Sequence, residues 1–358
     1  MPESQELRIL SIDGGGTRGI VPATILHGLG EATGKHPIEL FDLFAGTSTG
    51  GILCTSLLYG LPTDWIVQLY LDKSDDVFDD TWWDDVRDGF GKRIGADYSN
   101  RKFKQMLEKE FKNATLGDLD AKHGSQKMLM VTTFHLHPIE EGKPVNFRAK
   151  VYNSNFRKDK DIKLVDLVLR TTAAPTYFPI YQEHIDGGVA INHPAMSAVA
   201  FAINNNVDDN GSYCCPDGQY KGLRKTVNDL RVLSLSTGTS NRTYIDTAAI
   251  GKGNWGELQW ARYLPDLLIE ANMQVSEYYI RQVMPDNRYK RLELQFDDPA
   301  APPVIRKLMQ QGKVIGLDEK RRDVLLSLRD FAREYYHQHE AELLDFLKLT
   351  KVARGKQA

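Results

Sequence analysis

The chain has 358 residues, of which 41% are hydrophobic and 26% are charged, and its formal net charge is −3. These values are typical of a globular protein with one large domain or two smaller ones, and they exclude the strong basic field of a nucleic-acid-binding protein. No apolar run approaches the roughly 18 residues of a membrane-spanning helix, and the acidic start lacks the features of a signal peptide. The cysteines Cys54, Cys214 and Cys215 fit neither a disulfide framework nor a zinc site. We therefore expect a cytoplasmic protein with reduced thiols, no transmembrane segment and no metal site.

The first predicted strand covers residues 7–12, and the first predicted helix covers residues 20–29. Between them lies the glycine-rich segment Asp13-Gly14-Gly15-Gly16-Thr17-Arg18-Gly19. Two functions compete for this loop. Its G-x-G-x-x-G spacing matches a dinucleotide-binding loop, but Asp13 would place a carboxylate beside the phosphates. Alternatively, the exposed backbone N–H groups form an oxyanion hole, to which Arg18 adds positive charge.

The next predicted strand, residues 41–45, leads into Gly46-Thr47-Ser48-Thr49-Gly50 and a helix over residues 51–59. A G-x-S-x-G pattern between a strand and a helix is typical of a nucleophile elbow. Glycines flank the serine because so tight a reversal leaves no room for side chains. Ser48 would then lie above a helix N-terminus, where backbone N–H groups favour an anion. For the pentapeptide alone, a glycine-rich turn without chemistry is the alternative.

Further strands are predicted over residues 128–134, 145–152 and 230–236. Their alternation with helical segments predicts a parallel or mixed sheet covered on both faces, with the motifs at strand ends. Residues 204–218 are polar and turn-rich, which predicts a surface loop. Apolar residues recur at helical spacing over residues 318–347, so we expect a long helix packed on the domain, with Asp318 as its N-cap.

A candidate acid follows in the segment Ile185-Asp186-Gly187-Gly188-Val189. The two glycines predict a tight turn that lets another segment approach the carboxylate of Asp186 closely. A Ser-Asp-His triad would need a histidine beyond this acid. The chain has nine histidines, and His193 is the one in an evident loop motif. Because a histidine is more often structural than a base, Asp186 is the stronger candidate.

Together these motifs resemble the patatin-like phospholipase family, which has D-G-G-G-x-R-G, G-x-S-x-G and D-G-G/A in this order. The resemblance extends to the flanking segments 171–179, 192–195 and 232–239. It covers residues 7–240 and, more weakly, 267–296. It implies a three-layer α/β/α fold with a central, mostly parallel sheet. It also implies a catalytic core over residues 7–200 that carries all three motifs, with residues 201–358 completing the same domain.

By this resemblance Ser48 is the nucleophile and Asp186 the base of a Ser-Asp dyad that needs no metal or organic cofactor. The implied oxyanion hole is formed by Gly14, Gly15, Gly16, Arg18 and Thr49. The supporting turns are formed by Gly19, Gly46, Gly50, Gly187 and Gly188. Asp186 must be shielded from water, because an exposed aspartate with a pKa of ~3.9 is a poor base. Many relatives have asparagine where His193 stands, which leaves the role of this histidine open.

The resemblance implies a membrane phospholipid as substrate, met at the inner face of the membrane, and leaves open activation by a cyclic oligonucleotide. The basic residues Lys221, Arg224 and Lys225 are candidates for the nucleotide's phosphates, although such a run more often just faces water. Trp82 and Trp83 lie among aspartates, which favours core or lid packing over insertion into lipid. Two alternatives remain: a hydrolase of soluble esters or thioesters with the same dyad, and a nucleotide-binding sensor that uses the Gly14–Gly19 loop.

Overall fold

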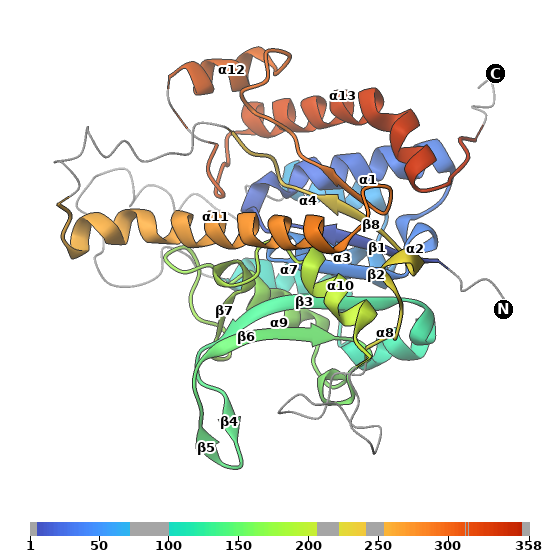
Figure 1. The fold of residues 1–358 in the computed structure, drawn as a ribbon. Coiled ribbons are helices and arrows are strands. Elements are labelled where there is room, and N and C mark those ends of the chain that lie inside the picture. The colour runs from blue at the N-terminus through green and yellow to red at the C-terminus, as the bar shows by residue number, and fades with distance from the viewer. Residues whose placement is uncertain are drawn as a thin grey trace.

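The computed structural model describes residues 6–71, 100–205, 222–240, 254–311, 313 and 315–352 (Figure 1). Trp82 and Trp83, Lys221, and residues 206–218 of the predicted surface loop lie outside the described residues. In the described chain, a seven-stranded sheet forms the centre of the molecule. Its order is β6 (Arg148–Asn153), β3 (Met128–His135), β2 (Leu43–Thr47), β1 (Leu7–Ile12), β8 (Leu230–Leu235) and β9 (Tyr289–Leu292), and β7 (His184–Asp186) also pairs with β3.

The sheet is mostly parallel, as predicted. Strands β3, β2, β1, β8 and β9 all run in one direction. Strands β6 and β7 both pair antiparallel with β3. The carboxyl ends of β1 and β2 therefore meet at one edge, where the glycine loop and the elbow begin. Thr133 pairs with Asp186, so β7 delivers its last residue to this same region.

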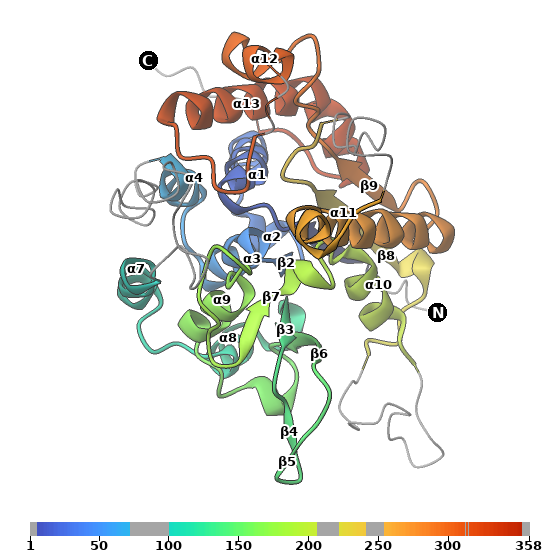
Figure 2. The same cartoon turned by 90° about the vertical axis from the view of Figure 1, so that its left-hand side faces the viewer.

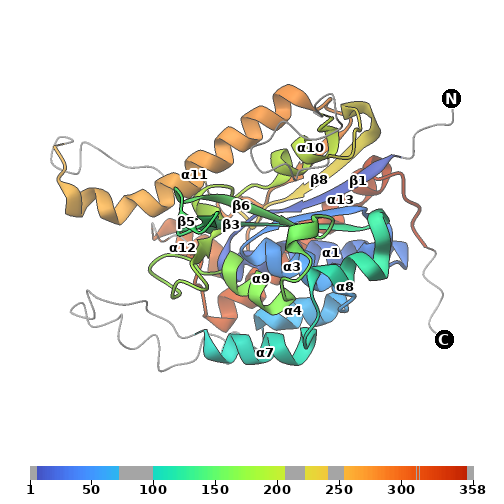
Figure 3. The ribbon, with the colours of Figure 1, turned by 90° about the horizontal axis from the view of Figure 1, so that it is seen from below.

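Helices cover both faces of the sheet, because successive residues of each buried strand point to opposite faces. Leu10 and Ile12 belong to the core shared with the larger helical layer, whereas Leu7 and Ile9 belong to the core on the other face. The larger layer contains α1 (Ile20–Thr33), α3 (Thr49–Tyr59), α4 (Thr63–Leu71), α7 (Arg101–Phe111), α8 (Leu116–His123), α9 (Leu164–Thr171), α12 (Pro303–Gln310) and α13 (Arg322–Phe346). The opposite layer contains α10 (Ala195–Ile203) and α11 (Glu257–Val283). Figure 3 shows the sheet between these two layers.

Short elements complete the described fold. These are α2 (Pro37–Leu40), the hairpin of β4 (Ile139–Glu140) and β5 (Lys143–Pro144), and the 3-10 turns η1 (Gly16–Gly19), η2 (Gly124–Gln126), η3 (Arg157–Asp159), η4 (Gly187–Val189) and η5 (Val227–Asp229). Figure 2 shows α13 lying across α1, and the buried Tyr336 of α13 packs in the core that they share. Among the described helices, none combines the length and the apolarity needed to cross a bilayer.

The expected elements are present, with shifted ends. Strand β1 has the predicted bounds, β6 begins at Arg148 instead of Val145, and α3 begins directly after Ser48. The prediction that Asp318 caps the last long helix is wrong, because α13 begins at Arg322 with Arg321 as its N-cap. The preceding residues are held elsewhere: the carbonyl of Leu317 accepts the backbone N–H of Thr17 at 2.8 Å. The chain therefore packs on the glycine loop before it enters the helix.

Candidate active site

Ser48 occupies a strained turn between β2 and α3. Its φ and ψ are 53° and −121°, a conformation that a non-glycine residue rarely adopts. The flanking glycines are needed for close backbone approach. A Cβ at Gly46 would overlap the backbone of Gly50, and a Cβ at Gly50 would overlap the carbonyl of Ile12. The sequence therefore folds here as the elbow that its G-x-S-x-G pattern predicts, with the serine at the N-terminus of α3.

A threonine relay holds this strained turn in place. The backbone N–H of Ser48 donates to Oγ1 of Thr171 at 2.8 Å, and that hydroxyl donates to the carbonyl of Thr132 at 2.7 Å. The elbow is thereby tied to the last residue of α9 and to β3. Because its own N–H is engaged, Ser48 cannot donate it to a bound anion.

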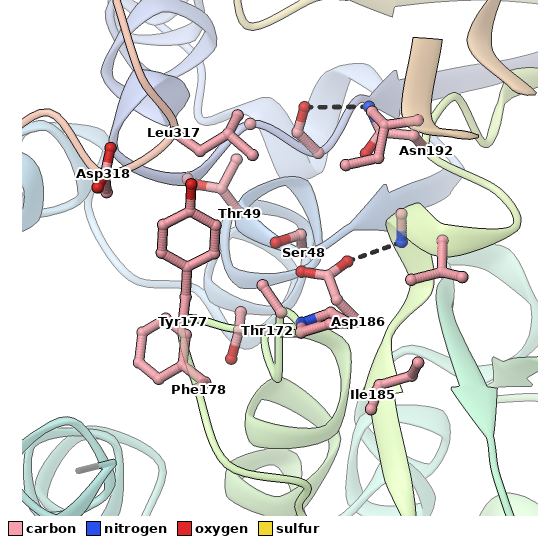
Figure 4. A pocket seen from close by; sticks show the side chains of 18 of the residues that line it. Ser48, Thr49, Thr172, Tyr177, Phe178, Ile185, Asp186, Asn192, Leu317 and Asp318 are labelled. Carbon is pink, nitrogen blue, oxygen red and sulfur yellow. Dashed lines mark hydrogen bonds between the residues drawn. The ribbon is translucent and has the colours of Figure 1, made fainter. Parts of the chain in front are cut away.

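Asp186 lies beside Ser48 at the end of β7 (Figure 4). Figure 4 shows its carboxylate directed toward the Ser48 hydroxyl, and one carboxylate oxygen accepts the backbone N–H of Gly188 at 2.7 Å. Its own N–H donates to the carbonyl of Ala173 at 2.9 Å. Burial raises the pKa of Asp186 to about 6, against the opposing effect of the Ser48 hydroxyl and the Gly188 N–H. A buried carboxylate with such a pKa can accept a proton near neutral pH.

The glycine loop faces this pair from the end of β1. Gly14 donates its N–H to the carbonyl of Asn192 at 3.1 Å, and its own carbonyl accepts Oγ1 of Thr237 at 3.1 Å. A Cβ at Gly15 would overlap the Thr237 side chain, and Gly16 has a φ of +56°, which favours glycine. The loop is thus packed from two sides, with its middle peptides beside Ser48.

The amides of this loop divide into two groups. The N–H groups of Gly14 and Arg18 are used inside the structure, the latter by the carbonyl of Gly15 at 3.2 Å. Within the residues that the structure describes, no hydrogen bond engages the N–H groups of Gly15, Gly16 or Thr49. These three amides are available to a developing oxyanion.

Arg18 is placed differently from its predicted role. Its Nε donates to the carbonyl of Gly15 at 3.4 Å, and it is not among the residues that line the cavity. Its described contact supports the loop from behind. Of the supporting glycines, Gly188 lines the cavity, whereas Gly19, Gly46, Gly50 and Gly187 lie where chain segments pack closely.

Ser48 and Asp186 open into a cavity of about 690 Å³. Such a volume is within the range of small-molecule sites. The apolar wall comes from several elements and includes Ile52, Phe103, Phe178, Leu264, Leu268 and Leu317. Leu264 and Leu268 of α11 are 44% and 50% exposed, so the apolar wall continues to the molecular surface. The cavity can therefore accept a long apolar group whose polar end stays near Ser48.

His193 lies in a buried cluster of charged groups behind the glycine loop. Its Nδ1 lies 2.8 Å from Oδ1 of Asp13, and its Nε2 lies 3.2 Å from Oε2 of Glu277. Arg291 donates from Nη2 to Oδ2 of Asp13 at 2.7 Å. Among the described residues, the partners of this histidine are thus members of the cluster and do not include Ser48. Asp13 faces the interior of the protein, away from any ligand in the cavity.

The sequence analysis did not identify the residues that contact this site from distant positions along the chain. Thr171, Asn192 and Thr237 each lie in a flanking segment that carries the family resemblance, so those segments were the available signal. Glu277 and Arg291 had no local signal, because only the folded chain brings Glu277 to His193 and Arg291 to Asp13.

Comparison with known proteins agrees with this geometry. The family model described as Patatin-like phospholipase matches residues 10–199. Patatin-12 of Solanum tuberosum is 28% identical over 319 residues, which cover 80% of this chain and 75% of that protein. A cGAMP-activated phospholipase of Pseudomonas aeruginosa (strain BWHPSA011 / Pa011) is 28% identical over 300 residues, which cover 82% of this chain and 79% of that protein.

The comparison also includes a relative described as inactive and a solved structure with low sequence identity. A probable inactive patatin of Solanum tuberosum, Patatin-3-Kuras 1, is 27% identical over 347 residues and covers 85% of each chain. The solved structure of human GIVD cytosolic phospholipase A2 aligns with a TM-score of 0.49 at 12% identity, over 97% of this chain and 60% of that one. Because relatives of similar identity include a probable inactive one, chemistry must be argued from the side chains themselves.

Proposed function

This chain belongs to the patatin-like phospholipase family, whose model matches more than half of it, and we propose that it cleaves acyl esters of membrane phospholipids through Ser48 and Asp186. The observation that carries the proposal is the contact between the Ser48 hydroxyl and the buried Asp186 carboxylate at the base of an apolar cavity. A lipid ester fits this site, because the cavity can hold an acyl chain while its carbonyl reaches the serine.

The reaction begins when Oγ of Ser48 attacks the ester carbonyl carbon and its proton passes to the Asp186 carboxylate. The carbonyl oxygen becomes an anion, which the amides of Gly15, Gly16 and Thr49 stabilise. The intermediate then collapses, the C–O bond to the lysolipid breaks, and protonated Asp186 returns the proton to the leaving alkoxide. Acyl-Ser48 remains.

In the second half, Asp186 takes a proton from a water molecule that attacks the acyl-serine carbonyl. The second tetrahedral intermediate expels Oγ of Ser48, which recovers its proton from Asp186, and a fatty acid leaves. No step uses a metal or an organic cofactor. The raised pKa of Asp186 suits both halves, because a group with a pKa near the working pH can both accept and return a proton.

A direct test compares the wild type with Ser48→Ala on phospholipid vesicles, with released fatty acid measured by mass spectrometry. The wild type should release fatty acid and react with a fluorophosphonate probe, and Ser48→Ala should do neither at a nearly unchanged melting temperature. Turnover above background in Ser48→Ala would exclude Ser48 as the nucleophile. A preference for a short soluble ester or thioester over vesicles would favour the alternative substrate class.

We further propose that a cyclic oligonucleotide regulates the enzyme, at the inner face of the membrane of its own cell. The similarity to the cGAMP-activated phospholipase of Pseudomonas aeruginosa supports this part. Adding a panel of cyclic di- and trinucleotides to the vesicle assay should raise the activity of the wild type. Full activity without nucleotide, unchanged by every member of the panel, would show a constitutive enzyme. Tight nucleotide binding by a chain that hydrolyses nothing would favour the sensor alternative.

A further inference from the structure

The buried cluster behind the glycine loop consists of charged side chains, whose burial in a protein interior costs desolvation free energy. Asp13 and His193 are fully buried, the side chain of Arg291 is 7% exposed, and the Glu277 side chain is 24% exposed. Three carboxylates, those of Asp13, Glu277 and Glu293, thus face the side chains of His193 and Arg291, and Tyr289 donates its hydroxyl to Glu277. Because buried ion pairs often fail to repay their desolvation, such a cluster suggests a role other than stability.

The charges in the cluster hold one another in their ionised forms. Burial raises the pKa of Asp13, but Arg291 and His193 outweigh this and leave it below its usual value. Burial lowers the pKa of His193, but Asp13 and Glu277 outweigh this and leave it above its usual value. Both ring nitrogens of His193 lie within hydrogen-bonding distance of a carboxylate oxygen, an arrangement that favours the cationic ring, in which both nitrogens are donors.

Two neighbouring residues, Asn192 and His193, connect the cluster to the glycine loop. His193 binds the side chain of Asp13, and the preceding residue, Asn192, accepts the N–H of Gly14 on its carbonyl. Asn192 also donates from Nδ2 to the carbonyl of Gly14 at 3.4 Å. The peptide that leads into Gly15 is thus held through both a side-chain pair and a backbone pair, so a shift of His193 would tilt the loop amides.

Helix α11 holds the other side of the same histidine. Ser276 donates its hydroxyl to the carbonyl of His193 at 2.8 Å, and Glu277 binds the histidine ring. One turn earlier, Asn272 accepts the N–H of Asn192 and donates to the carbonyl of Gly188, both at 2.8 Å. One face of α11 therefore holds both the glycine loop and the turn that follows Asp186.

We propose that His193 is a positioning residue that, clamped between Asp13 and Glu277, aligns the Gly15 and Gly16 amides with Ser48 and couples them to α11. This inference rests on the proposed function, because it assigns the loop to the oxyanion of that reaction. His193 itself takes no proton from Ser48. It acts on the transition state, in which the oxyanion exists, so its loss lowers kcat and leaves KM nearly unchanged.

The test measures kcat, KM and the fluorophosphonate labelling rate of His193→Asn on vesicles, after the wild type and Ser48→Ala have established the activity. We expect kcat and the labelling rate to fall about tenfold or more, with KM within about twofold. The pH dependence of kcat/KM should keep the inflection of the wild type, because Asp186 remains the base. An unchanged kcat, or a lost inflection, would overturn the proposal; an inactive wild type would overturn the proposed function with it.

A matched pair of arginine variants separates positioning from stability. Arg231 on β8 is 6% exposed and binds Glu6 at 2.8 Å, near the opposite ends of the strands. Arg291→Lys and Arg231→Lys each replace a nearly buried guanidinium, which donates to several acceptors, by a single ammonium. Both should lower the melting temperature, but only Arg291→Lys should lower kcat. Equal effects of the two variants on kcat would reduce the cluster to a stabilising role.

Glu277→Gln gives an independent measure if His193→Asn does not fold. It keeps a hydrogen-bond acceptor for the histidine and removes the charge on α11, while the pair of His193 with Asp13 remains. We expect kcat to fall about threefold to tenfold, less than for His193→Asn. Wild-type kcat in this variant, together with wild-type kcat in Arg291→Lys, would show that the cluster does not position the loop.

Discussion

Asp186 is the residue on which the proposed chemistry depends, because its environment balances two demands. Burial disfavours the carboxylate, whereas the Ser48 hydroxyl and the Gly188 N–H favour it. The resulting pKa of about 6 makes it a far better base than an exposed aspartate. Sequence patterns suggested this residue through its two following glycines, but they could not reveal the degree of burial.

A first prediction concerns the pH dependence of hydrolysis. Protonated Asp186 cannot accept the Ser48 proton, so kcat/KM should fall about tenfold per pH unit below about 6 and reach a plateau above it. Asp186→Asn should lower kcat by about 10²-fold or more at pH 7. Steady-state kinetics from pH 4.5 to 8 test both expectations. A flat profile in this interval would mean that another group accepts the proton.

A second prediction links this base to stability. Because the pKa of Asp186 lies near 6 in the folded protein and at 3.8 in the unfolded chain, the folded state binds more protons between these values. Stability therefore falls as the pH rises from about 4 to about 6, by up to about 3 kcal/mol. Asp186→Asn removes this cost, so it should be more stable than the wild type at pH 7 in urea unfolding. Equal stability at pH 7 would show that the carboxylate is well solvated.

At the scale of elements, the glycine loop depends on three neighbours that approach it from different parts of the chain. Asn192 and Thr237 bind Gly14, and Leu317 accepts the N–H of Thr17. The loop is therefore a packed element with little freedom, as an oxyanion hole requires, because donors that need not reorganise stabilise the anion best.

A third prediction tests this packing. A Cβ at Gly15 would collide with the Thr237 side chain, so Gly15→Ala should turn the loop amides and lower kcat about 10²-fold, the loss associated with one oxyanion donor. Gly30→Ala in α1 is the control: its Cβ meets the carbonyl of Lys35 at 3.3 Å, in the last turn of the helix, at the end away from the loop. Activity should be unchanged there. If Gly15→Ala were as active as Gly30→Ala, the loop would not form the oxyanion hole.

The sequence predicted the elements whose residues follow a local pattern. Strand β1 and the elbow were recognisable because apolar residues precede glycines at each strand end. The sequence indicated a strand that ends at Asp186, but three residues are too few to give the bounds of β7. Helix α11 was missed because its apolar residues face both the cavity and the surface. The start of the last helix was misplaced because the Leu317 carbonyl binds a residue 300 positions away.

The same limit applies to the site. Ser48, Asp186 and the glycine loop each lie in a motif that can be recognised in the sequence, and the structure brings them together at one cavity. Asp13 and His193 each stand in a recognisable motif, but no pattern in the sequence indicates that they pair with each other or with Arg291 of β9. Residues that act through long-range contacts leave no periodic or spaced signal in one sequence.

At the scale of the whole molecule, the site draws on nearly the full length of the described chain. The proposed nucleophile and base lie at positions 48 and 186, yet the residues that hold the loop extend to Leu317. The N-terminal and C-terminal parts of the chain share one sheet, in which β1 lies between β2 and β8. A fourth prediction follows: a chain ended after residue 285 keeps Ser48 and Asp186 but should not react with a fluorophosphonate. Labelling at the rate of the full chain would show that β9 and Leu317 are dispensable.

The hydrogen bond between Thr17 and Leu317 also determines how late in synthesis the glycine loop can be completed. A ribosome that has just added Ser48 must add about 270 more residues before Leu317 exists, which takes about 15 to 50 s at ordinary rates of translation. Throughout that interval the nascent chain carries Ser48 without the contact that holds the glycine loop from Leu317. Under the proposed function, unfinished chains should hydrolyse no lipid, and stalled chains that end before residue 317 should be inert towards membranes.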